Sequence, residues 1–188
     1  LPHSFYVSGG ALAVENALKA AFDWKVRKNI QKGHAELGSK VLHFEKCFHG
    51  RSGYTLSLTD SPDPRKVKYF PKFDWPRVST PNINFPLDEK NLANVIKREN
   101  ISLEQIKEAI QKNPNDIACI IIEPIQGEGG DNHFRPEFLI ALKDICLEND
   151  ILLVFDEVQT GVGITGKMWV HQHFDLPECE PDIISFGK

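Results

Sequence analysis

"ILLVFDEV", residues 151–158, is the stretch of sequence that decides the fold. It is apolar at every position before Asp156, which is typical of a parallel strand that helices cover on both faces. A second run of the same kind, "IACIIIE" at 117–123, precedes it, and the segment 136–150 between the two runs is predicted as a helix. This order of strand, helix and strand predicts an α/β protein with a mostly parallel, doubly wound sheet and right-handed crossovers.

The same alternation of short β-type runs and longer helical runs extends outward from this stretch. Further strands are predicted at 4–8, 40–45 and 182–188, and further helices at 11–28 and 103–112. The helix at 11–28 follows two glycines and is rich in residues that favour helices. No internal repeat or low-complexity tract interrupts the pattern, so we expect one domain over the sequence.

One long segment, 59–87, does not follow this pattern, because prolines interrupt it and aromatic residues crowd it. A loop of this length in a compact domain is usually functional or buried against another chain. Arg77 lies in it, together with the rings of Tyr69, Phe70, Phe73, Trp75 and Phe85. Aromatic residues and arginine are enriched at interface cores. We therefore predict a homodimer with 59–87 at or near the subunit interface; the alternative is that the rings fold back and cap their own domain.

The composition excludes several classes of protein. With 188 residues, of which 41% are hydrophobic and 26% charged, the chain is long enough for one well-packed domain. Its formal charge of −4 gives no basic footprint for nucleic acid. No apolar run reaches the roughly 18 to 20 residues that span a bilayer, and the first ten residues lack the features of a signal peptide. We expect a soluble, cytoplasmic protein with no nucleic-acid or membrane partner, and its scattered cysteines fit reduced thiols.

Two further motifs suggest ligands at first sight. "GVGITGKM", residues 161–168, resembles a phosphate loop, but Met168 stands where a magnesium-binding serine or threonine is needed. It also resembles a dinucleotide fingerprint, but the residues after it soon reach prolines and do not predict the required helix. His171 and His173 have no third metal ligand at a suitable spacing, so a partly exposed polar strand is predicted there. We expect neither a nucleotide nor a metal at these positions.

The flanks of the glycine loop favour different chemistry. Asp156 lies at the carboxyl end of a buried strand, and Lys188 ends the next apolar run. A carboxylate and an amine at neighbouring strand ends are what pyridoxal 5'-phosphate requires, because the lysine binds the cofactor covalently and the carboxylate keeps the ring nitrogen protonated. Its phosphate needs a helix N-terminus, which "SGGALAVENALK" provides through the backbone amides of Gly10 and Ala11.

Several stretches together resemble the class III (ω-amino) aminotransferases of pyridoxal-phosphate fold type I. The resemblance runs over the whole chain and is carried by "GGALAVENALKAAFDWK", "FHGRSGYTLSLT", "FPKFDWPR", "EPIQGEGGDNHFRPEF" and "DEVQTGVGITG". It implies that 1–188 is part of the large cofactor-binding domain of a fold-type I transferase. The sequence stops at the cofactor lysine, so the rest of that domain and a small C-terminal domain are expected outside it.

The resemblance also implies roles for individual residues. Lys188 would bind the cofactor and later move the substrate proton, and Asp156 would pair with the ring nitrogen. Gln159 would hydrogen-bond the phenolic oxygen of the ring, and Phe48 would stack on its face. Outside the family context, Phe48 is more simply explained as a core aromatic residue, and Asp156 as a strand-end residue.

The substrates are implied in the same way. Arg51 would bind an α-carboxylate as a bidentate fork, and Glu128 would neutralise an arginine that lies outside this sequence. Ile164 stands where many relatives carry arginine, and an aliphatic residue there suits the family members that act on lysine. We therefore expect transfer of the 6-amino group of L-lysine to 2-oxoglutarate, giving 2-aminoadipate 6-semialdehyde and L-glutamate. The alternatives are an ornithine, acetylornithine or 4-aminobutyrate donor, or a truncated module that binds a partner without catalysis.

Overall fold

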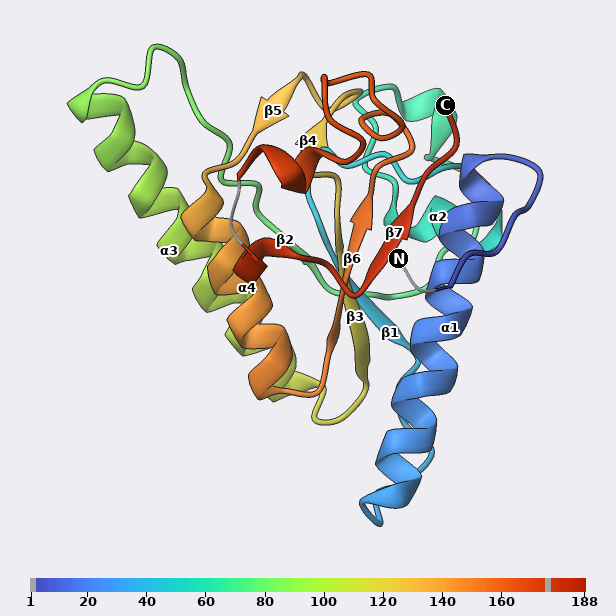
Figure 1. Ribbon diagram of the computed structural model, residues 1–188. Helices are drawn as coiled ribbons and strands as arrows, with labels where there is room; N and C mark the ends of the chain where they lie inside the picture. The colour runs from blue at the N-terminus through green and yellow to red at the C-terminus, as the bar shows by residue number, and fades with distance from the viewer. Residues whose placement is uncertain (1–2, 175–176) are drawn as a thin grey trace.

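A five-stranded sheet, in which every pair of neighbouring strands runs parallel, forms the middle layer of the molecule (Figure 1). The computed structural model describes residues 3–174 and 177–188. In spatial order the strands are β2 (Arg77–Val78), β1 (Lys40–Phe44), β3 (Ile117–Ile122), β6 (Leu152–Asp156) and β7 (Ile183–Ser185). The parallel, doubly wound α/β sheet predicted from the apolar runs is confirmed.

Helices cover both faces of this sheet, which is why its central strands are apolar throughout. Figure 1 shows long helices on opposite sides of the sheet. They are α1 (Gly10–Gln31) on the first side, and α3 (Glu89–Lys112) and α4 (Pro136–Glu148) on the second. Ile121 of β3 and its register partner Val154 belong to the core under α1, whereas Ile120 and Leu153 belong to the core under α3 and α4.

The remaining elements are short. The helix α2 (Gly53–Leu58) contacts α1, and a separate antiparallel pair joins β4 (Ile125–Gln126) to β5 (Asn132–His133). Three 3-10 helices complete the described chain: η1 (Pro64–Lys66), η2 (Val170–His173) and η3 (Pro177–Cys179). Within the described residues, no helix combines the length and the apolar character needed to cross a membrane.

Three of the local predictions were wrong or incomplete. Residues 4–8 form no strand, because no sheet edge pairs with them, and Phe5 and Tyr6 remain 73% and 78% exposed. His171 and His173 lie in η2 instead of a polar strand. The helix predicted at 103–112 is only the second half of α3, which begins where Asp88 accepts the backbone N–H of Asn91 at 2.8 Å.

The segment 59–87 contains more structure than a loop. It supplies η1 and the edge strand β2, which pairs with β1 through His43 and Arg77. Phe73 stacks on Trp75 with ring centroids 5.0 Å apart, and both rings pack against Tyr54 of α2. Phe73 and Trp75 therefore follow the alternative prediction, in which the rings fold back on their own domain. Tyr69, by contrast, stays 83% exposed.

The path of the chain through the sheet decides where a ligand can bind. From β1 the chain goes first to β2 on one side, and then through α3 to β3 on the other side of β1. Connections that leave a sheet in opposite directions open a crevice at the carboxyl ends of the strands, where open α/β proteins bind their ligands. The segments that follow β1, β3 and β6 meet at this edge.

Candidate active site

The centre of the crevice is a buried pair of side chains from two different strand ends. Nδ1 of His49, five residues after β1, lies 2.7 Å from Oδ2 of Asp156, the last residue of β6. The other carboxylate oxygen accepts the backbone N–H of Val158 at 3.0 Å. Burial opposes a charged imidazole, but the Cys47 sulfur and the Asp156 carboxylate favour it, and the balance raises the pKa of His49 well above its ordinary value. The site therefore holds a fixed carboxylate with its own counter-ion.

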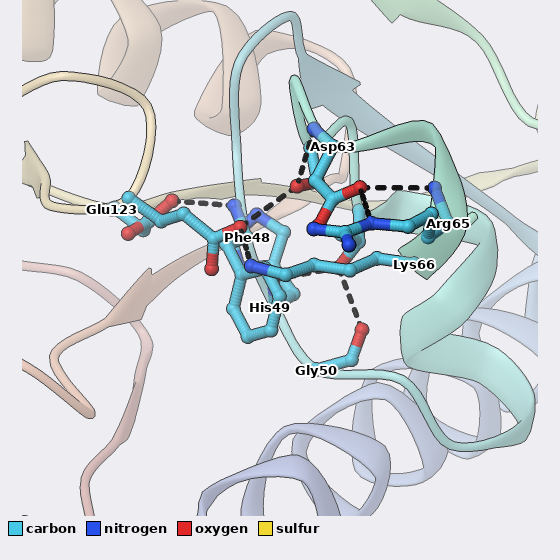
Figure 2. A network of polar contacts seen from close by, with 10 residues as sticks. Phe48, His49, Gly50, Asp63, Arg65, Lys66 and Glu123 are labelled. Atoms are coloured by element: carbon cyan, nitrogen blue, oxygen red, sulfur yellow. Dashed lines mark hydrogen bonds and ion pairs between the residues drawn. The ribbon is translucent and has the colours of Figure 1, made fainter.

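A second buried carboxylate joins the segments after β1 and β3. Glu123 accepts the backbone N–H of Phe48 at 2.8 Å and that of Gly127 at 3.4 Å. Figure 2 shows Glu123 and Phe48 joined beside His49. Burial raises the pKa of Glu123 to about 7, although the His49 charge and the two backbone N–H groups work in the opposite direction. Glu123 thus fixes the backbone that presents the Phe48 ring.

The start of α1 forms another wall of the crevice. A Cβ atom on Gly10 would stand 2.5 Å from Cγ1 of Val158, so only glycine allows the helix to begin this close to the end of β6. Gly50 approaches Ala11 just as closely, since a Cβ atom on Gly50 would lie only 2.7 Å from the alanine Cβ. The backbone N–H groups of Gly10 and Ala11 donate to no other described residue, as expected in the first turn of a helix.

Lys188 reaches this edge through β7. Asp156 and Ser185 are register partners in β6 and β7, which confirms that the carboxylate and the lysine follow neighbouring strands. Gly187 packs against Gly10, since a Cβ atom on Gly187 would lie 3.4 Å from the Gly10 nitrogen. Lys188 comes next and is exposed at the end of the sheet towards which the arrows of β6 and β7 point (Figure 1).

Gln159, three residues after β6, lies against Gly127 in the segment that follows β3. Its Oε1 atom would stand 2.6 Å from a Cβ atom on Gly127, so the amide lies directly across that glycine. Gln159 is half-buried. The absence of a side chain at position 127 is what leaves room for this amide group.

The outer part of the crevice carries charged side chains. Arg51 is exposed and makes no hydrogen bond or ion pair with another described residue. Oε1 of Glu128 accepts from Nζ of Lys66 at 2.7 Å and from Oγ of Ser61 at 2.8 Å. Although partial burial acts in the opposite direction, these two hydrogen bonds and the charges of Lys66 and Arg51 lower the pKa of Glu128.

These features fit the predicted cofactor. A buried carboxylate with a histidine counter-ion suits a protonated ring nitrogen, and the free amides of Gly10 and Ala11 suit a phosphate group. Nε2 of His49 is buried without a partner among the described residues, so the histidine retains an unused polar atom beside the site. The chain therefore offers groups for both ends of pyridoxal 5'-phosphate.

The motifs set aside in the sequence have structural explanations. Residues 161–168 form successive turns and bends, and no helix begins at their glycines. Val162 adopts a φ of 62°, and the buried Glu157 accepts the backbone N–H of Val170, so the loop is folded back onto the end of β6. Within residues 3–174 and 177–188, no cluster of three metal-ligating side chains occurs.

Three residues of the site were missed in the sequence: His49, Glu123 and Lys66. His49 stands between Phe48 and Arg51 in the stretch "FHGR", and its position there was the available signal. Glu123 directly follows an apolar strand run, as Asp156 does, and this position at the carboxyl end of a strand was its signal. Lys66 has no such signal, because its contact with Glu128 joins residues 62 positions apart.

Comparisons with known proteins agree with this geometry. The family model described as "Aminotransferase class-III" matches residues 2–188. The L-lysine-epsilon aminotransferase of Mycobacterium tuberculosis is 56% identical over all of this chain, which covers 40% of that protein. The enzyme of the same name from Amycolatopsis lactamdurans is 53% identical, again over the whole chain and 41% of the relative.

A solved structure gives the same result in three dimensions. The lysine aminotransferase from M. tuberculosis in the internal aldimine form superposes with a TM-score of 0.92 at 55% identity, over 100% of this chain and 42% of that one. The chain thus spans about two fifths of the length of the relatives it matches. From its sequence and its fold alike, the chain belongs to the class III aminotransferases.

Proposed function

We propose that this chain is the cofactor-binding part of an L-lysine 6-aminotransferase, which transfers the 6-amino group of L-lysine to 2-oxoglutarate. The observation that carries the proposal is the buried Asp156–His49 pair at the carboxyl end of β6. Val158, two residues after Asp156, packs against Gly10 at the start of α1, and the neighbouring strand β7 leads to Lys188. The names of the relatives from M. tuberculosis and A. lactamdurans support the choice of donor. The products are 2-aminoadipate 6-semialdehyde and L-glutamate.

The proposed cofactor is pyridoxal 5'-phosphate, which, when bound, supplies an electron sink for the negative charge that develops on the substrate carbon. Lys188 holds it covalently, and the amides of Gly10 and Ala11 bind its phosphate. Asp156 keeps the ring nitrogen protonated, Gln159 donates to the phenolic oxygen, and Phe48 covers one face of the ring. The solved lysine aminotransferase described as an internal aldimine supports this assignment.

Different residues of the chain bind the substrate and transfer its proton. Arg51 binds the α-carboxylate of L-lysine in a bidentate manner, which leaves the 6-amino group at the far end of the molecule directed into the crevice. Nζ of Lys188, freed when the 6-amino group of the substrate takes its place, would then accept the proton from C6, the carbon that bears the reacting amine, and return it later in the reaction. Glu128 neutralises positive charge at the outer part of the crevice.

We also propose that the protein is a cytoplasmic homodimer with the segment 59–87 near the subunit interface. Tyr69 and Phe85 support the dimer, because they remain 83% and 69% exposed in this chain and apolar rings of this size favour burial. The buried, free thiols of Cys47, Cys119 and Cys146 support a reducing compartment.

Borohydride reduction of the full-length protein, followed by peptide mass spectrometry, tests the assignment of the cofactor lysine. The pyridoxyl adduct is expected on Lys188; an adduct on Lys167 in the glycine loop would overturn the assignment. A panel of L-lysine, L-ornithine and 4-aminobutyrate with 2-oxoglutarate tests the donor. The highest kcat/KM is expected for L-lysine, and a clear preference for another donor would show that the proposed substrate is wrong.

A further inference from the structure

The backbone on either side of Arg51 is held by helix α1. Gly50, which precedes Arg51, adopts a φ of 117° and packs against Ala11, since a Cβ atom on Gly50 would lie 2.7 Å from the alanine Cβ. Ser52, which follows Arg51, donates its hydroxyl group to Oε1 of Glu15 at 2.6 Å. Ala11 and Glu15 are four residues apart on α1, so one face of this helix contacts both neighbours of Arg51.

Glu15 is the polar part of this contact. It is half-buried on α1, and besides the Ser52 hydroxyl its Oε1 atom accepts the backbone N–H of Tyr54 at 3.2 Å. Both donors lie at the start of α2, which follows Arg51 directly. Hydrogen bonds to a carboxylate belong to the stronger, charge-assisted class. Glu15 therefore ties the start of α2 to α1.

A second set of hydrogen bonds holds the chain just before Arg51. Oγ1 of Thr59, the residue directly after α2, accepts the backbone N–H of His49 at 3.0 Å and donates to the backbone oxygen of Gly50 at 2.7 Å. Thr59 is buried. Arg51 itself is exposed and has no hydrogen-bond or ion-pair partner in the described part of the chain, so the placement of its guanidinium depends on this backbone.

We propose that Glu15 is a positioning residue for the substrate carboxylate: by holding Ser52 against α1, it sets the place from which the Arg51 side chain extends. The inference rests on the proposed function, in which Arg51 binds the α-carboxylate of L-lysine. The amides of Gly10 and Ala11, which are proposed to bind the cofactor phosphate, begin the same helix. Through Glu15, one helix therefore aligns the carboxylate end of the substrate with the cofactor, as a reaction at the opposite end of a long substrate requires.

Two donors that differ only in the carboxylate test this inference in the full-length holoenzyme. Glu15→Ala removes the acceptor of the Ser52 hydroxyl and the Tyr54 amide, so the bend that carries Arg51 is released from α1. The KM for L-lysine should rise about tenfold, with little change in kcat. The KM for 1,5-diaminopentane, which lacks the carboxylate, should hardly change. An equal rise for both donors would show that Glu15 has only a structural role.

Two further variants separate positioning from a general loss of stability. Glu15→Gln keeps an oxygen that can accept from Ser52, so the KM for L-lysine should stay within about threefold of the wild-type value. Asp23→Ala is the matched control, because it removes a carboxylate from an exposed position of the same helix, where Asp23 binds Arg27 four residues on. It should change neither KM. A Glu15→Gln variant as impaired as Glu15→Ala would contradict the inference.

Ser52→Ala tests the same contact from its other side. It leaves the carboxylate in place but removes the hydroxyl donor, so the KM for L-lysine should again rise. Because both substitutions break one hydrogen bond, their effects on this KM should not add in the double variant Glu15→Ala with Ser52→Ala. Fully additive effects would show that the two residues act independently, contrary to the inference.

A binding measurement makes the test independent of turnover. Hexanoate has the carbon chain and carboxylate of lysine but no amine, so it cannot react, and calorimetry gives its Kd directly. Arg51→Met and Glu15→Ala should each weaken hexanoate binding about tenfold, and Asp23→Ala should not. If the wild type did not bind hexanoate, or if Arg51→Met left its Kd unchanged, the proposed role of Arg51 would fail. If Arg51→Met weakened binding and Glu15→Ala did not, only the inference about Glu15 would be wrong.

Discussion

Nδ1 of His49 and Oδ2 of Asp156 lie 2.7 Å apart in a part of the molecule that water does not reach. The imidazole holds one oxygen of the carboxylate, and the Val158 amide donates to the other. The pair therefore provides a rigidly held carboxylate with a basic side chain beside it.

The pH dependence of stability follows from the direction of the His49 shift. Because the pKa of His49 is raised in the folded state above 6.5, its contribution is fully present below pH 6.5 and is lost as the pH rises through the folded value. We expect His49→Gln to lower the free energy of unfolding by about 3 to 5 kcal/mol at pH 6, since it leaves a buried charge unpaired. Urea unfolding between pH 6 and pH 10 should show the difference from wild type becoming smaller. The exposed His34→Gln is the control and should change neither the stability nor its pH profile.

Glu123 gives a second, lower pH window. Its pKa is raised from 4.5 to about 7, so the folded state keeps a proton that the unfolded state releases, and stability falls as the pH rises between these values. The shift corresponds to about 3 kcal/mol. In Glu123→Gln, which cannot ionise, this part of the pH dependence should be absent. A wild-type minus variant difference that stays flat from pH 4.5 to pH 7 in urea unfolding would contradict the raised pKa.

The glycine at the start of α1 should tolerate no side chain. Gly10→Ala places a methyl group 2.5 Å from Cγ1 of Val158, so Val158 or the helix must move, at a cost of about 1 to 3 kcal/mol. We expect lower thermal stability together with weaker cofactor retention, measured by visible absorbance after gel filtration. Gly53→Ala is the matched control, because its methyl group meets only Oε1 of Glu15 at 3.6 Å. Equal behaviour of the two variants would argue against close packing at Gly10.

Substitutions of Trp75 and Tyr69, two aromatic residues of 59–87, should affect different properties: the first the stability of the subunit, the second its association. Trp75 packs against Phe22, Tyr54 and Phe73 of its own chain, so Trp75→Ser should lower the free energy of unfolding by about 2 kcal/mol or more. Tyr69 is exposed, so Tyr69→Ser should leave the stability of the subunit nearly unchanged and weaken association instead. Sedimentation velocity and urea unfolding separate the two effects. If Tyr69→Ser had no effect on association at micromolar concentration, Tyr69 would lie outside the interface.

The parts of the fold that the sequence predicts best are those with unbroken apolar runs. The predicted bounds of β3 and β6 agree closely with the observed ones, because a strand covered on both faces needs no polar position. The strand predicted at 4–8 has a similar local pattern but no partner strand, and pairing is a tertiary property that a local pattern does not contain. The first half of α3 was missed because two of its buried positions, Glu99 and Ser102, are polar and interrupt the apolar periodicity, while its Asp88 cap and its packing stabilise it.

In the site, too, local sequence patterns predict some residues but not their partners. The positions of Asp156 and Lys188 after neighbouring strands could be predicted because both residues end apolar runs. The glycines before α1 drew attention because they let a ligand approach the helix N-terminus closely. The partners of these residues could not be predicted in this way. His49 meets Asp156 across 107 positions and Lys66 meets Glu128 across 62, and only the folded path of the chain brings such residues together.

Helix α1 also fixes the distance between the crevice and the far end of α4. Its buried Lys25 donates to the backbone oxygens of Asn149 and Asp150 at the far end of α4, while Gly10 begins the same helix at the crevice. The two points are fixed roughly 22 Å apart by the rise of the helix alone. Adding or deleting one residue between them would shift the first turn by about 1.5 Å and rotate it by about 100°. The number of residues between Gly10 and Lys25 is therefore under stricter constraint than the identity of most of them, and a deletion in the exposed face of α1 should damage the crevice more than any substitution there.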